Sequence, residues 1–263
     1  METIELRRLA PEVVERLVRD MNAHGYARIA GFFPATTIAE ARRWVLRELA
    51  KHNGEYFSYI GRDAVNGSPM AALGGSPALR RLFAEIYQCG LGRPAPESGV
   101  FQVLRVLAGS TGVRQSYRFH YDAYVVTALV PIAIPEGDGE RRGDLVIYPK
   151  LRSIRRNIVV NLLEKMLLQN PLARWAAASR LIQRLLGAKL LRMVPGDIYF
   201  FWGYQSLHGN EPCAPTSFRS TALFHFADPH ENSPAVALIQ SLRRRHEQRI
   251  RDRAMARAVR RAS

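Results

Sequence analysis

A histidine and an aspartate two positions apart in this sequence could bind a metal ion. Phe119-His120-Tyr121-Asp122 lies in a segment with a strand-like pattern, and side chains two apart on a strand project from one face. A second histidine from a facing strand would complete the set, and His208 is the best candidate. Two histidines and one carboxylate on ferrous iron leave open positions for a chelating cosubstrate and O2. The sequence therefore predicts an iron site on His120, Asp122 and His208.

An arginine follows the second histidine at a spacing that suits a keto-acid cosubstrate. Arg219 lies eleven positions after His208, on the next predicted strand. Its guanidinium could bind the distal carboxylate of 2-oxoglutarate through a bidentate pair, and Thr221 on the same face could add a hydroxyl. Taken singly, a His-x-Asp triplet occurs by chance in many proteins, and a buried arginine is more often half of a salt bridge. The order of these residues along the chain is what favours the iron site.

The elements that must position these residues change in type along the chain. Apolar periodicity predicts helices over 11–24, 36–52 and 77–88, with a short strand over 26–30. Residues 53–77 are rich in Gly, Ser, Pro and Asn and are typical of a long loop, which often forms a functional lid. The later strand patterns cover 100–107, 117–121, 124–134, 145–148, 190–194, 197–202 and 219–227. Short strands with Gly/Pro turns indicate a sandwich or jelly roll.

Several of these segments resemble a known family. The first, His24-Gly25-Tyr26-Ala27-Arg28-Ile29-Ala30-Gly31-Phe32-Phe33, is similar to the family's opening helix, strand and Gly-Phe element. Phe101-Gln102 resembles an early core strand that carries a glutamine. Val194-Pro195-Gly196-Asp197-Ile198-Tyr199-Phe200-Phe201 resembles the Gly-Asp turn before the second histidine, and His208-Gly209 and Arg219 follow at the family's spacing. Over most of its length the chain looks like the Fe(II)/2-oxoglutarate oxygenases, and most like their phytanoyl-CoA dioxygenase-like branch.

This resemblance implies a fold, a cofactor set and a reaction. The fold would be a double-stranded β-helix, a cupin-like jelly roll with mainly β and some α structure, flanked by N-terminal helices. Iron would bind His120, Asp122 and His208, and 2-oxoglutarate would bind Arg219, with Thr221 and Gln102 as further contacts. Gln102 could instead satisfy the backbone. The reaction would consume O2, release succinate and CO2 and hydroxylate a substrate, with ascorbate as a further candidate cofactor. Asp122, in place of Gly or Ala, favours hydroxylation over halogenation.

Four residues near the predicted ligands are candidate substrate contacts: Arg118, Tyr124, Arg105 and Trp202. Strand alternation places Arg118 on the face of His120, where it could meet an anionic substrate or form a surface ion pair. Trp202 belongs to an aromatic cluster that is more often core than substrate platform. The other histidines have no partner at ligand spacing, so we expect them to be structural or solvated.

The net charge of +15 is unevenly distributed. A helical insert over 151–192 follows Gly143–Pro149 and carries nine basic residues against Glu164, and a basic helical tail over 234–263 carries nine more. Apolar residues recur in the insert at helical spacing, so it could lie on an anionic membrane, with a lipid, a glycolipid or a lipopolysaccharide sugar as the substrate. The more ordinary interpretation, which we favour, is that it packs on the β-core as a lid or dimer surface with its charges solvated. Nucleic acid is a weaker alternative, because aromatic residues do not interleave with the arginines.

The remaining sequence features concern the number of domains, the cysteines and the cellular location. We expect one oxygenase domain over 1–263, in which Cys89 and Cys213 are free thiols. The first ten residues have no signal-peptide core, which predicts a cytoplasmic protein, peripheral on the inner face of the membrane if the insert binds lipid. An oxygenase that acts on nucleic acid or protein, and a non-catalytic jelly roll that binds a ligand, remain as alternatives. The sequence does not indicate an oligomeric state.

Overall fold

The computed structural model describes most of the chain. The described residues are 6, 8–136, 142–154, 160, 164, 166 and 170–230. The predicted basic tail over 234–263 lies outside them, as does part of the predicted insert. Among the described residues no helix is long and apolar enough to cross a membrane.

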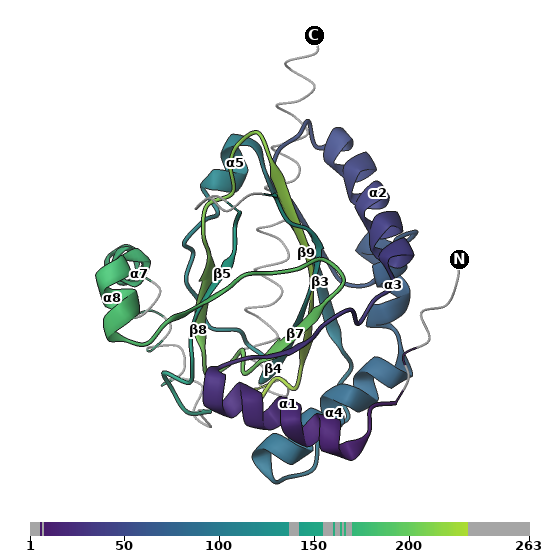
Figure 1. Cartoon of the computed structure of the whole chain (residues 1–263), viewed down its shortest axis with the longest axis vertical. Coiled ribbons are helices and arrows are strands. Elements are labelled where there is room, and N and C mark those ends of the chain that lie inside the picture. Colours follow the sequence, from purple (N-terminus) through teal and green to yellow (C-terminus); the bar gives the residue numbers. More distant parts are fainter. Residues whose placement is uncertain are drawn as a thin grey trace.

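Two antiparallel sheets form the centre of the molecule (Figure 1). The strands of the large sheet are, in order, β1 (Ala27–Ile29), β7 (Ile198–Phe201), β4 (Val126–Ala133), β9 (Phe218–Phe226), β3 (Phe101–Ala108) and β2 (Phe57–Ile60). Those of the small sheet are β6 (Lys189–Leu191), β5 (Leu145–Tyr148) and β8 (Leu207–Asn210). The neighbours β3 and β9, and β9 and β4, are far apart in sequence, which is the crossed connectivity of a jelly roll. The predicted jelly-roll fold is confirmed.

Helices cover the outer face of the large sheet. They are α1 (Pro11–His24), α2 (Ala35–Lys51), α3 (Pro69–Gly74) and α4 (Pro77–Leu91), and Figure 1 shows them together on one side of the molecule. The ring of Phe83 on α4 lies 6.2 Å from Phe200 and 5.7 Å from Phe226, centroid to centroid. Phe224 and Leu104 join the same core, so alternate residues of these strands face the helices.

The other set of alternate residues faces the space between the two sheets. On β9 this set contains Leu223, which packs with the core formed by both sheets, and His225, which reaches Asp122. Since side chains two apart share a face of a strand, Arg219 and Thr221 point the same way. The inner face of β9 is therefore the face that carries polar chemistry.

Two predicted elements differ from the structure. The predicted loop over 53–77 contains β2, a short 3-10 helix (Asp63–Val65) and α3, and β2 forms an edge of the large sheet. The predicted strand over 117–121 is absent from the described fold. A short helix, α5 (Gly109–Val113), precedes this segment, and Tyr117 has a left-handed φ of 52° that breaks the extended path. His120 pairs with β8 only through an isolated bridge to His208.

The described part of the insert contains two short helices that pack against the small sheet, followed by β6. These are α7 (Pro171–Ala178) and α8 (Arg180–Leu185), which lie on the side of the molecule away from α2 in Figure 1. The Asn170 side chain caps α7 by accepting a hydrogen bond of 2.8 Å from Ala173 N, and Pro171 occupies the first turn. Ser179, with extended backbone angles, separates the two helices.

Candidate metal centre

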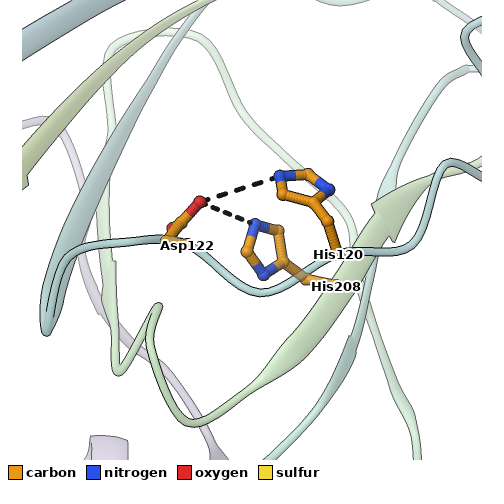
Figure 2. A group of neighbouring side chains, drawn as sticks. All are labelled: His120, Asp122 and His208. Atoms are coloured by element: carbon orange, nitrogen blue, oxygen red, sulfur yellow. Dashed lines mark ion pairs between the residues drawn. The ribbon is translucent and has the colours of Figure 1, made fainter. Parts of the chain in front are cut away.

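Three side chains converge between the sheets in the geometry of a metal-binding group. Nε2 of His120 and Nε2 of His208 lie 3.7 and 3.6 Å from the same oxygen, Asp122 Oδ1 (Figure 2). One ligand atom from each residue lies within 4.8 Å of the others. The side chains of Asp122 and His208 are almost fully buried, whereas that of His120 is 34% exposed. The structure thus brings together the three predicted ligands, with access from the His120 side.

The hydrogen bonds of the two imidazoles leave their Nε2 atoms available. His120 Nδ1 lies 2.8 Å from the carbonyl oxygen of Arg118, and His208 Nδ1 lies 3.0 Å from that of Ser206. A carbonyl can only accept, so each Nδ1 carries the proton and each Nε2 presents a lone pair. His208 Nε2 is buried and has no hydrogen-bond partner among the described residues. Metal-binding histidines characteristically have this outer contact, so the residues fit a metal ion.

The protonation states also suit a cation. Burial, followed by the neighbouring His208, lowers the pKa of His120 to about 3. Burial alone would raise the pKa of Asp122, but three nearby histidines and a hydrogen bond from Thr127 hold it below its usual range. The lowered pKa values keep the His120 imidazole neutral and the Asp122 carboxyl ionised at neutral pH. Two nitrogen donors and one oxygen donor match the facial set typical of non-haem Fe(II).

Two residues that sequence reasoning missed orient the carboxylate. Thr127 Oγ1 donates a hydrogen bond of 2.6 Å to Asp122 Oδ2, and His225 Nδ1 lies 3.0 Å from Thr127 Oγ1 and 3.6 Å from Asp122 Oδ2. These contacts occupy Oδ2, so Oδ1 is the oxygen that faces the histidines. His225 has the same strand parity as Arg219 and Thr221, which is the one sequence signal that pointed to it.

A glycine allows this close approach. A Cβ on Gly203 would overlap both Thr127 Oγ1 and Asp122 Oδ2. The backbone of Gly203 lies close to Asp122 because Asp122 N donates a hydrogen bond of 3.0 Å to Gly203 O. Any larger residue at position 203 must therefore displace the carboxylate or the irregular segment that holds it.

Arg219 is a buried cation on the same inner face. It is 1% exposed, and burial, together with the charge of Arg105, lowers its pKa to about 9. With the Asn210 amide oxygen turned toward it, Nη1 and Nη2 donate at 3.1 and 2.8 Å. Among the described residues no carboxylate forms an ion pair with Arg219, and the Thr221 hydroxyl is buried without a hydrogen-bond partner. A buried guanidinium of this kind is suited to an anionic ligand.

Comparisons with known proteins bear on the fold. A scan against protein-family models and a search of curated proteins find no match for this sequence. Among solved structures, a prolyl-4-hydroxylase from Pseudomonas putida aligns with a TM-score of 0.52 and 14% identity over 86% of this chain and 98% of its own. A prolyl hydroxylase from Trichoplax adhaerens, in complex with a hypoxia inducible factor peptide, aligns with a TM-score of 0.52 and 12% identity. This alignment covers 83% of this chain and 90% of the hydroxylase.

A third structure contains the relevant small molecules. The epimerase SnoN, in complex with Fe3+, alpha ketoglutarate and nogalamycin RO, aligns with a TM-score of 0.50 and 16% identity over 83% of this chain and 85% of its own. This chain has the fold of these enzymes. The likeness confirms the double-stranded β-helix fold. The phytanoyl-CoA dioxygenase-like branch stays a prediction.

A second arginine lies on the inner face of this double-stranded β-helix. Arg105 is directly opposite Thr221 in the β3–β9 register, so the two side chains share a face. Its charge lowers the pKa of both His120 and Arg219. The ring of Tyr56 lies 5.9 Å from its guanidinium, and no described carboxylate forms an ion pair with it. This predicted substrate contact therefore does lie near the cluster.

Two other predicted site residues point away from the cluster. Gln102 is opposite Phe224, on the helix side of the sheet, and donates a hydrogen bond of 2.8 Å to Met70 O. It therefore satisfies the backbone, and its prediction as a cosubstrate contact is corrected. Trp202 is 1% exposed and donates to Asn22 Oδ1 at 2.9 Å, so it belongs to the core under the helices.

The remaining two substrate candidates lie at the surface or the rim. The exposed side chain of Arg118 donates to Gln115 Oε1 at 2.6 Å, which directs it along the surface, and only its carbonyl serves the metal cluster. Tyr124 stacks on Phe101 at 5.3 Å and on His225 at 5.4 Å. Tyr124 thus packs on a residue that lies beside Asp122, so it remains a candidate substrate contact.

An arginine at the start of the insert holds both ligand segments. The guanidinium of Arg152 lies 4.1 Å from the ring centroid of Tyr121 and 4.2 Å from that of Tyr204. Its Nε donates a hydrogen bond of 2.7 Å to Tyr204 O. Tyr121 stands between two of the predicted ligands, and Tyr204 begins the turn that leads to His208. Arg152 therefore ties the insert to both sides of the metal cluster.

Proposed function

We propose that this chain is an Fe(II)- and 2-oxoglutarate-dependent oxygenase that hydroxylates a small molecule or amphiphile. The observation that carries the proposal is the cluster of His120, Asp122 and His208. Their three ligand atoms face one another while both Nδ1 atoms and Asp122 Oδ2 are already hydrogen-bonded. Buried lone pairs without partners are costly unless a ligand uses them.

Each residue has a definite part in this proposal. His120, Asp122 and His208 would hold the iron, and Thr127 and His225 would keep Asp122 Oδ1 directed at it. Arg219 would bind the distal carboxylate of 2-oxoglutarate, assisted by the Thr221 hydroxyl. When bound, iron with 2-oxoglutarate and O2 supplies the oxidant that converts a substrate C–H bond to C–OH, with release of succinate and CO2.

The substrate class follows from the second inner arginine. If 2-oxoglutarate neutralises Arg219, Arg105 is left beside the cluster as a cation that no described carboxylate pairs. A half-buried cation without an anionic partner favours a ligand that carries its own negative charge. We therefore propose an anionic substrate, such as an acidic lipid or glycolipid headgroup, including a lipopolysaccharide sugar.

Cosubstrate binding tests the proposal directly. The apoprotein, given Fe(II) and 2-oxoglutarate without oxygen, should develop a weak visible charge-transfer band. His208→Ala should abolish this band, whereas His24→Ala, at a histidine that is 68% exposed and outside the cluster, should leave it unchanged. A wild-type protein that shows no band and forms no succinate in air would overturn the oxygenase proposal and favour a jelly roll that only binds a ligand.

Substrate class needs a separate experiment. Cell extract should be fractionated on an anion-exchange column and each fraction incubated with enzyme, Fe(II), 2-oxoglutarate and ascorbate. We expect a product heavier by one oxygen atom in the retained fractions. Arg105→Met should lose this product but keep the charge-transfer band, and Arg105→Lys should retain part of it. A product found only in the unretained fraction would refute the anionic substrate while leaving the oxygenase proposal intact.

A further inference from the structure

The two helices of the insert expose an unusual set of large apolar side chains. The exposed fractions are 80% for Leu172, 75% for Trp175, 66% for Leu181, 74% for Leu185 and 53% for Leu186. Single exposed leucines are ordinary, but five large apolar residues within fifteen positions are not. We call these five residues the α7–α8 apolar surface.

The spacing shows that this surface is a feature of the helices. Leu172 and Trp175 are three apart on α7, and Leu181 and Leu185 are four apart on α8, so each pair lies on one face of its helix. The two helices contact each other and lie side by side in Figure 1. The apolar residues therefore belong to neighbouring helices that are held together.

The opposite faces of these helices already pack on the fold. Ala177 joins the core on the outer side of the small sheet, and its carbonyl accepts a hydrogen bond of 2.6 Å from Tyr148 Oη. The buried side chain of Gln183 donates to the carbonyls of Ala177 and Ala178 at 3.3 and 3.4 Å. Folding thus buries Ala177 and Gln183 and leaves the leucines outward, whereas an ordinary surface helix buries its large apolar residues.

The charged residues in the stretch that carries this surface are all basic. Residues 171–192 contain Arg174, Arg180, Arg184, Lys189 and Arg192, and no aspartate or glutamate. Arg180 forms an ion pair of 2.9 Å with Glu211 and is still 48% exposed. Arg184 and Lys189 are exposed beside the leucines. A ligand that covers this surface must therefore be apolar in its interior and anionic where it meets the cations.

We propose that the α7–α8 apolar surface docks on an anionic lipid bilayer. Phosphate headgroups would meet the arginines and lysine, while the leucines enter the acyl boundary and Trp175 occupies the interface, where tryptophan is favoured. A second copy of this chain would be repelled, because it would present the same cations. The proposal does not depend on the metal cluster, which lies between the sheets.

Tryptophan fluorescence provides a specific test. The chain has three tryptophans, and Trp44 and Trp202 are buried at 7% and 1% exposed, so a change in emission on binding reports on Trp175. Vesicles of phosphatidylglycerol mixed with phosphatidylcholine should shift the emission to shorter wavelength, and brominated acyl chains should quench it. Trp175→Phe should lose the shift but still sediment with the vesicles.

Matched variants distinguish binding through the α7–α8 apolar surface from nonspecific adsorption to vesicles. Leu181→Glu and Leu185→Glu should each lower sedimentation with the anionic vesicles roughly tenfold or more, because an apolar side chain that would enter the acyl boundary becomes a charge. Leu46→Glu, at a leucine on α2 that is 44% exposed, should have no effect. Raising the salt concentration should weaken binding, since headgroup attraction is screened.

Three results would overturn the proposal. The first is no emission shift and no sedimentation with any vesicle. The second is equal binding to pure phosphatidylcholine, which would remove the role of charge. The third is a lipid-free dimer, seen by analytical ultracentrifugation and abolished by Leu185→Glu, which would make a second copy the occupant. In each variant an unchanged thermal shift on Mn(II) addition shows that the fold and metal cluster are intact.

Discussion

Replacement of Arg152 should weaken both the fold and the metal site. Its side chain is 2% exposed, and its guanidinium lies over the rings of both Tyr121 and Tyr204. Arg152→Met keeps the length and apolar stem but removes the charge and both cation–π contacts. Arg152→Lys keeps the charge but cannot stack as a plane or donate from Nε, so it should be intermediate.

The magnitude follows from the contacts that are lost. Two desolvated cation–π contacts contribute roughly 1–2 kcal/mol each, and a charged donor to a carbonyl contributes about 1.5–3 kcal/mol. Burial lowers the pKa of Arg152, which shows that the buried charge itself costs free energy. Arg152→Met removes this cost, and the methionine side chain recovers some packing, so both effects oppose the losses. We expect Arg152→Met to lower the free energy of unfolding of the apoprotein by ~2–4 kcal/mol.

The effect on the metal site is separate and has its own measurement. Tyr121 lies between two ligands, so loss of its stacking partner loosens the segment that positions them. Disturbed outer contacts typically cost about 10–100-fold in metal affinity, and Mn(II) titration by calorimetry at a temperature where both proteins are folded would measure this. Arg184→Met, at an exposed arginine on α8, is the matched control. The reasoning fails if Arg152→Met unfolds at the wild-type urea concentration and binds Mn(II) with wild-type affinity.

Three further substitutions test single contacts. Gly203→Ala should reduce Mn(II) affinity about tenfold or more, because the added Cβ overlaps Asp122 Oδ2. Gly99→Ala, whose added Cβ meets no atom within 4 Å, should leave the affinity unchanged. Equal Mn(II) titration curves for the two variants would contradict this prediction. Thr127→Val leaves one carboxylate oxygen without its donor, so urea unfolding of the apoprotein should show a loss of roughly 1–3 kcal/mol, and an unchanged midpoint would refute it. Arg219→Met removes a buried charge, so the stability of the apoprotein should be unchanged or higher. The stabilisation of ~2.7 kcal/mol that 2-oxoglutarate gives near 100 Kd should be lost. A thermal shift that 2-oxoglutarate still produces in this variant would count against Arg219 as the cosubstrate contact.

The predicted ligands come together because their signal is local and chemical. The jelly-roll order of the strands carries His120, Asp122 and His208 to one place even though the first two lie on an irregular segment and not on a strand. Parity on β9 likewise placed Arg219 and Thr221 together. These inferences needed only residue type, order and period, which the sequence contains.

The errors arise where the sequence does not determine which face of a strand is inward. On β3 the residues Val103, Leu104, Val106 and Leu107 are all apolar, so alternation gives no direction. The register with β9 decides it, because Gln102 is opposite Phe224 on the helix side. Thr127 and His225 were missed for the same reason, since the β4–β9 register that pairs them joins residues 98 positions apart in the sequence.

The insert is anchored too firmly for its removal to serve as a test of membrane binding. Arg152 holds its start against the metal-ligand segments, Tyr148 binds Ala177 in its middle, and its end contains β6, which pairs with β5. Deletion of 151–192 would therefore remove a strand of the small sheet and a clamp of the metal cluster along with the apolar surface. Lost vesicle binding after such a deletion would be indistinguishable from lost folding. Point substitutions on the outward faces of α7 and α8 avoid this, because those side chains are the part of the insert that the described fold does not use.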